Sequence, residues 1–272
     1  MSAHPRPGRR GLRASAAVAI ALLALVFGVT APASAAPPPP VQKYVALGDS
    51  YAAGQGAGAP LDGCLRSAAA YPVLLDAEPR TNLLRTAACS GATIADVAAT
   101  QLSQVNRGTT LVTLTVGAND LGVGAIAAAC TVNAYAPECY EAVDAAEKIL
   151  ASGAIATGIA DLVGAIAQRA PNAQIVVADY PMPYNATSEL ELYVNQATAT
   201  LDYQIGLGVA TAAGNGANAV VASMAFSFVG HQIGDGSASY LGADPAIMLT
   251  YFHPTAAGQA LYRDAILLAL SN

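Results

Sequence analysis

Short apolar runs rich in β-branched residues alternate with longer alanine-rich stretches, and this alternation constrains the fold more than any other feature. The apolar runs predict five strands, at residues 44–48, 82–86, 111–116, 174–179 and 217–221. The longer stretches predict helices at residues 141–169, 188–213 and 254–270. Strands that are apolar on both faces and separated by helices are typical of a parallel sheet covered by helices. We therefore expect an α/β fold, a three-layer α/β/α sandwich with a mostly parallel five-stranded sheet.

The first 35 residues are predicted to be a signal peptide. Arginines near the start precede an unbroken run of small and apolar residues at 16–29, and Ala33-Ser34-Ala35 has the small-x-small pattern that signal peptidase cleaves. The run of about 14 residues is shorter than the roughly 20 that cross a bilayer, which argues against a retained anchor. We expect secretion after cleavage near Ala35, with no stable membrane anchor. Residues 36–42 are predicted to be a proline-rich linker, and residues 43–272 a single domain.

The mature chain is strongly acidic. Four arginines leave with the signal peptide, so 8 basic and 18 acidic residues remain, and the formal charge is about −10 (8 minus 18). Affinity for nucleic acid depends on Lys and Arg at phosphates, so we expect no nucleic-acid partner. The same charge disfavours strongly anionic membranes. We expect the domain to be a monomer.

Four cysteines in an exported chain, Cys64, Cys89, Cys130 and Cys139, predict two disulfides. They allow three pairings, and we favour Cys64–Cys89 with Cys130–Cys139 because each of these bonds closes a local loop. The sequence has no C-x-x-C spacing, and only two of its histidines lie in the mature chain. Zinc is therefore not expected, and we expect neither a metal nor a cofactor.

Residues suited to acyl transfer lie where strands of the predicted sheet end or just before the last helix. Ser50 follows the first strand, Gly91 the second and Asn119 the third, and His253 precedes the final helix. Ligands of a parallel sheet bind at the carboxyl ends of its strands. A serine nucleophile needs a base to take its proton, and the oxyanion that forms needs hydrogen-bond donors already in place.

Four segments resemble, in the same order, the sequence blocks of the SGNH hydrolases, which are also called the GDSL lipases and esterases. They are residues 45–51, 89–92, 117–120 and 253–255. The resemblance extends over nearly all of the mature chain and is strongest to secreted actinomycete lipases and phospholipases. It implies a flavodoxin-like sheet and a serine ester hydrolase. It also implies the two disulfides favoured above, whereas the third pair that these relatives often carry is missing here.

The resemblance also assigns roles to individual residues. Ser50 is expected to be the nucleophile and His253 the base, while the backbone amides of Ser50 and Gly91 and the side chain of Asn119 form the oxyanion hole. Asp49 is expected to brace the nucleophile loop rather than to act as an acid. Asp120 is expected to be a structural partner of Asn119. His231 is expected to be a solvated or loop-bracing histidine, and a loop that lines the acyl cleft is the alternative for it.

The chain departs from the common family pattern at the acid that orients the histidine. The family places aspartate three residues before the histidine, and that position is Thr250 here. Some secreted actinomycete relatives use a backbone carbonyl instead, which by resemblance would be that of Thr250 or Tyr251. Asp244 folding back is the alternative. We expect a Ser-His dyad rather than a triad.

The substrate is expected to be a small-molecule or lipid ester, with a fatty acyl group in particular. The sequence has no long apolar lid and no tryptophan for stacking on sugars, and small residues follow Ser50 at positions 52–54. Two alternatives remain open from sequence. One is an O-deacetylase of sugars or polysaccharides that uses the same site, and the other is a non-catalytic binding protein of the same fold.

Overall fold

Five parallel strands form one sheet in the order β2-β1-β3-β4-β5. They are β1 (Gln42–Gly48), β2 (Thr81–Thr86), β3 (Leu111–Thr115), β4 (Gln174–Ala178) and β5 (Ala219–Ala222). The structure is a computed structural model that describes residues 1, 4 and 40–271, so the predicted signal peptide and most of the predicted linker lie outside the described residues. The predicted sheet and its three-layer sandwich are confirmed.

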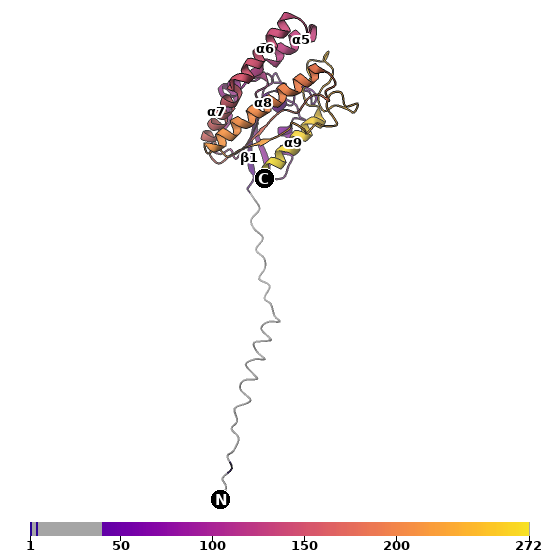
Figure 1. The fold of residues 1–272 in the computed structure, drawn as a ribbon. Coiled ribbons are helices and arrows are strands. Elements are labelled where there is room, and N and C mark those ends of the chain that lie inside the picture. The colour runs from indigo at the N-terminus through magenta and orange to yellow at the C-terminus, as the bar shows by residue number, and fades with distance from the viewer. Residues whose placement is uncertain (2–3, 5–39, 272) are drawn as a thin grey trace. The chain divides into compact units, whose positions relative to one another are not determined.

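Both faces of the sheet are buried because successive strand residues point to opposite sides. In β1, Val45 and Leu47 belong to one apolar cluster, while Tyr44 and Ala46 belong to a second one. Helices α7 (Ala154–Arg169) and α8 (Glu189–Gly214) cover the first face and lie side by side in Figure 1. Helices α2 (Ser50–Ala53), α3 (Tyr71–Asp76) and α9 (Ala256–Ser271) cover the second.

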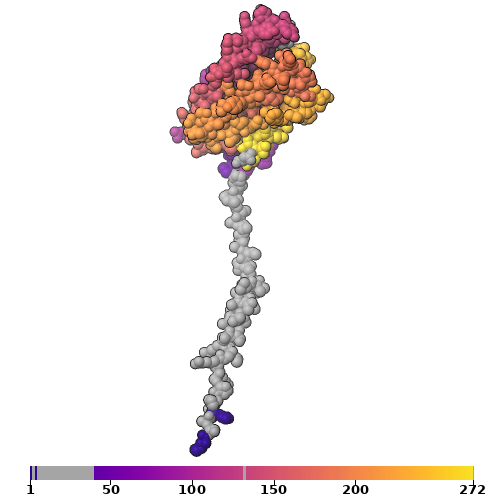
Figure 2. All heavy atoms as spheres, in the orientation of Figure 1, coloured from indigo at the N-terminus to yellow at the C-terminus, as the bar shows by residue number. Residues whose placement is uncertain are grey.

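The remaining helices connect these layers. They are α4 (Ile94–Asp96), α5 (Val123–Val132) and α6 (Pro137–Ser152), with short π and 3-10 turns at Val97–Gln101, Leu102–Gln104 and Asn119–Leu121. The sequence predicts one helix over 141–169, which is wrong, because the chain breaks at Gly153 in a left-handed conformation with φ of +74°. In Figure 2, the pink atoms of α5 and α6 lie beyond one end of the orange atoms of α8.

No single helix among the described residues is long and apolar enough to cross a membrane. Helices α6 and α7 meet the criteria of length and composition only together, as a pair bent by 60°.

Two disulfides pair the cysteines as Cys64–Cys89 and Cys130–Cys139. The first joins the loop after α2 to the segment that follows β2, across a sequence separation of 25 residues. A loop of this size stabilises a fold by about 3 kcal/mol in the loop-entropy treatment. The second joins α5 to the first turn of α6.

Helices α7 and α8 meet closely at Gly208, and this contact gives a prediction about stability. A Cβ atom at Gly208 would lie 2.6 Å from the Ala156 carbonyl oxygen and 2.7 Å from the Ile159 Cβ, whereas one at Gly206 would meet nothing within 4 Å. We expect Gly208→Ala to lower the free energy of unfolding by about 2 kcal/mol through overpacking.

Gly206→Ala is the matched control because it changes the same helix without the clash. It is expected to raise the free energy of unfolding by about 0.5–1 kcal/mol, since alanine favours helices over glycine. Urea unfolding of both variants measures the difference. Equal effects at the two positions would show that the close approach of α7 and α8 is not a constraint.

Candidate active site

Ser50 lies at the carboxyl end of β1, as the first residue of α2. Gly48 has a φ of +134°, and a side chain there would collide with the Thr115 carbonyl, so the strand ends in close contact with β3. Asp49 caps the helix, because its Oδ1 accepts a hydrogen bond of 2.9 Å from the Tyr51 backbone N–H. The Ser50 N–H belongs to the first turn of α2 and has no acceptor among the described residues.

His253 lies just before α9 and reaches the nucleophile. Its Nε2 is 2.9 Å from the Ser50 Oγ, and its Nδ1 is 2.9 Å from the Tyr251 carbonyl oxygen. A carbonyl can only accept, so the Nδ1 that faces it carries the proton and leaves Nε2 free to accept one from serine. The Ser50 hydroxyl and the His253 ring therefore lie at the distance that proton transfer to a general base requires.

Of the two carbonyls considered for orienting the histidine, only that of Tyr251 contacts the ring. The Thr250 carbonyl accepts instead from the His253 backbone N–H at 2.9 Å. Asp244 turns to its own loop, where its Oδ1 accepts from the Ala246 N–H at 2.9 Å.

The environment of His253 favours its neutral form. Burial lowers the pKa of His253 to about 4, and the hydrogen bond to the Tyr251 carbonyl opposes this only in part. An imidazole with a lowered pKa stays unprotonated, and so available as a base, further into the acid range than an ordinary histidine.

This gives a prediction for the pH profile. The acid limb of kcat/KM on a soluble ester is expected well below pH 6.5, the ordinary value for histidine, and close to the pKa of about 4 of the buried ring. Rates between pH 3.5 and 8 measure it, and circular dichroism at each pH checks that the protein stays folded. A limb at or above pH 6.5 would contradict the neutral, buried histidine.

Two further donors follow the ends of β2 and β3, the two strands that neighbour β1. The Cys89 N–H donates to the Gly48 carbonyl at 3.0 Å, which brings the segment after β2 against the end of β1. Gly91 follows in a left-handed conformation, and its N–H has no acceptor among the described residues. The Asn119 Nδ2 donates to the Ala92 carbonyl at 3.0 Å, and this bond uses one of its two protons. Among the described residues, the backbone amides of Ser50 and Gly91 and one proton of the Asn119 amide therefore have no acceptor.

The neighbouring acids brace these segments. The Asp49 Oδ2 accepts from the Tyr180 hydroxyl at 2.5 Å, and the Ala118 N–H donates to the same hydroxyl at 3.2 Å. Burial raises the pKa of Asp49 to about 7, against the hydrogen bonds from Tyr180 and from the backbone that lower it. Asp120 accepts from the Ile94 N–H at 3.0 and 3.2 Å.

His231 contacts a different part of the chain. Its ring stacks on that of Tyr240 with centroids 3.9 Å apart, and its Nδ1 is 3.1 Å from the Ala238 carbonyl oxygen. These contacts brace a loop and give the ring no partner in the site.

Two residues that the sequence analysis did not single out also contact the site. The Tyr51 hydroxyl donates to the Phe252 carbonyl at 2.5 Å, and the carboxamide of Gln55 lies beside His253. Both lie within five positions of Ser50. A polar side chain among the small residues that follow the nucleophile was the only signal for Gln55.

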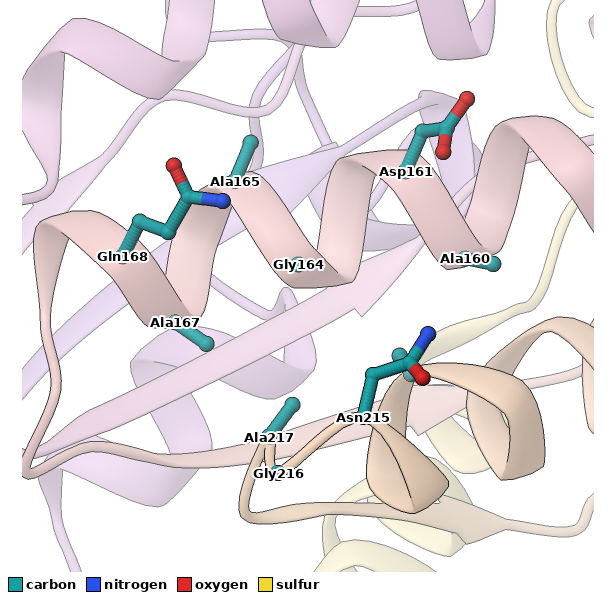
Figure 3. A pocket seen from close by; sticks show the side chains of 10 residues that line it. Ala160, Asp161, Gly164, Ala165, Ala167, Gln168, Asn215, Gly216 and Ala217 are labelled. Carbon is teal, nitrogen blue, oxygen red and sulfur yellow. The ribbon is translucent and has the colours of Figure 1, made fainter.

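A surface pocket elsewhere in the molecule holds none of these residues. Figure 3 shows it between the second half of α7 and the turn after α8, lined by small side chains with Asp161, Gln168 and Asn215. These segments lead into β4 and β5, so the pocket lies at the amino ends of the strands, opposite the edge that carries Ser50.

Comparisons with known proteins identify the family and agree with the fold. The model of the GDSL-like lipase/acylhydrolase family matches residues 46–261. A lipase of Streptomyces rimosus is 33% identical over 271 residues, which cover 94% of this chain and 96% of the relative. Lipase 1 of Streptomyces coelicolor is 32% identical over 85% of this chain and 87% of its own.

Solved structures show the same likeness. The extracellular lipase of Streptomyces rimosus superimposes with a TM-score of 0.72 and 32% identity, and phospholipase A1 of Streptomyces albidoflavus with 0.70 and 30%. Each match covers 84% of this chain and 99% of the solved chain. With these relatives, the fold defines a carboxylic ester hydrolase. The chain belongs to the GDSL-like lipase/acylhydrolase family, as its four sequence blocks implied.

Proposed function

We propose that this chain is a secreted hydrolase of fatty acyl esters that acts through a Ser50–His253 dyad and an acyl-enzyme. The observation that carries the proposal is the 2.9 Å contact between the Ser50 Oγ and the His253 Nε2, with the opposite ring nitrogen on the Tyr251 carbonyl. A backbone carbonyl thus takes the place that an aspartate occupies in a triad.

The reaction follows from this geometry. As the Ser50 Oγ attacks the ester carbonyl carbon, its proton passes to the His253 Nε2, and the carbonyl oxygen becomes an oxyanion that receives the Ser50 and Gly91 amides and the Asn119 side chain. Collapse breaks the ester bond, and His253 returns the proton to the departing alcohol. Water then attacks the acyl-enzyme with His253 as base, which releases the acid and restores Ser50.

The relatives support the substrate class and the location. Their names are lipase and phospholipase A1, and one of them is described as extracellular. Two disulfides suit an oxidising compartment. The site holds its polar groups at the sheet edge, whereas Ala52 and Ala53, which follow the nucleophile, are buried in the core and do not line it.

Labelling and a substrate panel test the proposal. A serine-reactive alkyl phosphonate is expected to add one mass label, at Ser50, and to abolish hydrolysis. A chain-length series of p-nitrophenyl esters, assayed beside a phospholipid and an acetylated sugar, is expected to favour the acyl and lipid esters. Failure to label Ser50 would overturn the mechanism, and activity on the acetylated sugar alone would replace the substrate class with O-deacetylation.

A further inference from the structure

A buried glutamine joins the three segments of the site. We propose that Gln55 is a positioning residue, which holds the oxyanion loop (residues 89–92) and the histidine loop (residues 247–253) against the nucleophile helix and keeps a donor nitrogen, instead of a carboxylate, beside the His253 ring. This inference rests on the proposed dyad and deepens it.

The hydrogen bonds of Gln55 reach all three segments. Its side chain is buried, and the residue is only 7% exposed. Its Nε2 donates to the Leu249 carbonyl at 2.8 Å, and its Oε1 accepts from the Ser90 hydroxyl. Its own backbone N–H donates to the Ser50 carbonyl at 3.0 Å. One side chain therefore fixes Ser90, the neighbour of the oxyanion donor Gly91, relative to the loop that carries the base.

The same carboxamide lies against the ring of His253. The Gln55 Nε2 is 3.4 Å from the His253 Nδ1, but both atoms carry protons when the ring is ready to act as a base. The contact is then one between two donors. If the side-chain amide were flipped, its oxygen would face the Leu249 carbonyl oxygen and the hydrogen bond to that carbonyl would be lost. The partially positive Nε2 amide of Gln55 therefore lies beside His253 Nδ1, where a triad would place a negatively charged carboxylate.

This arrangement opposes protonation of the ring. Other titratable groups near His253 are the Tyr51 phenol, whose ring centroid is 5.9 Å away, and Asp49 on the far side of Ser50. Burial raises the pKa of the Tyr51 hydroxyl, so this group is neutral, and Asp49 is paired with Tyr180. Gln55 is the polar side chain that faces Nδ1 directly, so exchange of its amide for a carboxylate changes the charge beside the base.

The decisive variant is Gln55→Glu. A carboxylate beside Nδ1 favours the imidazolium, and an opposite charge at this range shifts a pKa by about 1–3 pH units. We expect the acid limb of kcat/KM to move upward by that amount. The introduced carboxylate still accepts from Ser90 but loses the hydrogen bond to the Leu249 carbonyl. An acid limb that stays in place would show that the side chain at position 55 does not face the His253 ring.

Gln55→Leu tests the positioning role by removing both side-chain hydrogen bonds. A misplaced catalytic group lowers turnover by about 10–100-fold, so we expect kcat to fall in that range with KM changed less than threefold. Gln204→Leu is the matched control, because Gln204 is about as buried as Gln55 and its side-chain hydrogen bonds go to Leu150 and Ala156, with none to Ser50, to His253 or to their loops. It is expected to lower stability and to leave the position of the acid limb unchanged.

Phosphonate labelling distinguishes a failure of the Ser50–His253 dyad from a failure of the role proposed for Gln55. If Ser50 of the unaltered protein is not labelled, the dyad itself is wrong. If it is labelled, and the acid limb of Gln55→Glu coincides with that of the unaltered protein, the role of Gln55 is wrong and the dyad stands. Should Gln55→Leu fail to fold, Gln55→Met and Gln55→Glu decide the same question. An upward shift in Gln55→Glu that Gln204→Leu does not share supports the proposal.

Discussion

Replacing Ser50 or His253 by alanine is expected to lower kcat by about 10⁴–10⁶-fold, and replacing both is expected to lower it no further. The two side chains act as one unit, since the serine is a poor nucleophile unless the Nε2 at 2.9 Å accepts its proton. Residual activity should come from the oxyanion donors and from substrate binding, which all three variants keep. Initial rates on a soluble p-nitrophenyl ester, corrected for contaminating hydrolase by phosphonate titration, measure the effect.

His231→Ala is the matched control for this experiment. It removes the other histidine of the mature chain, whose ring stacks on Tyr240 rather than contacting Ser50. Activity within about threefold of the unaltered protein is expected, because surface substitutions away from a site have small effects. A loss with His231→Ala as large as that with His253→Ala would show that the wrong base has been assigned. Full turnover by Ser50→Ala would show the same for the nucleophile.

Asn119→Ala is expected to lower kcat by about 10²–10³-fold with little change in KM, which is the effect of removing one oxyanion donor. The side chain faces charge that develops only in the transition state, so its loss affects turnover more than ground-state binding. Steady-state kinetics of the purified variant, with its Tm recorded, separate this effect from a loss of folded protein.

A control and a second variant sharpen that result. Asn215→Ala changes an exposed asparagine at the end of α8 and is expected to leave kcat unchanged. Asn119→Asp keeps the size of the side chain but exchanges the donor for an acceptor, so it should be at least as inactive as Asn119→Ala. If Asn119→Asp retained full activity, Asn119 would not be an oxyanion donor.

The sheet could be predicted from the sequence because its strands are buried on both faces and read as apolar runs. The break at Gly153 could not, since the residues on both sides of it are alanine-rich and a single glycine is tolerated within a helix pattern. Helix α2 is too short for a periodic signal, being fixed by the Asp49 cap and by Gly54 in a left-handed conformation.

The reactive residues of the site were predictable from the sequence, whereas the contacts that hold them in place were not. Ser50 and His253 stand out by residue type and position, and their pairing across 203 residues follows from the family resemblance. Which carbonyl meets the ring depends on the local turn, where Phe252 has a φ of +60°. Gln55 meets Leu249 across 194 residues, and such a contact arises only when the sheet brings the two segments together.

The Cys64–Cys89 bond also determines how the site can open. Strand β2 lies at the edge of the sheet, with most of its residues partly or fully exposed, and such edges are where local unfolding begins. The segment that carries Gly91 is held to the loop around Cys64, not only to β2. Its two links to that loop are the disulfide and a hydrogen bond of 3.1 Å from the Ser90 N–H to the Cys64 carbonyl. Fraying of β2 therefore leaves the donor in place. In hydrogen exchange, the amide protection of this segment should follow global unfolding in the oxidised protein and edge opening in the reduced one.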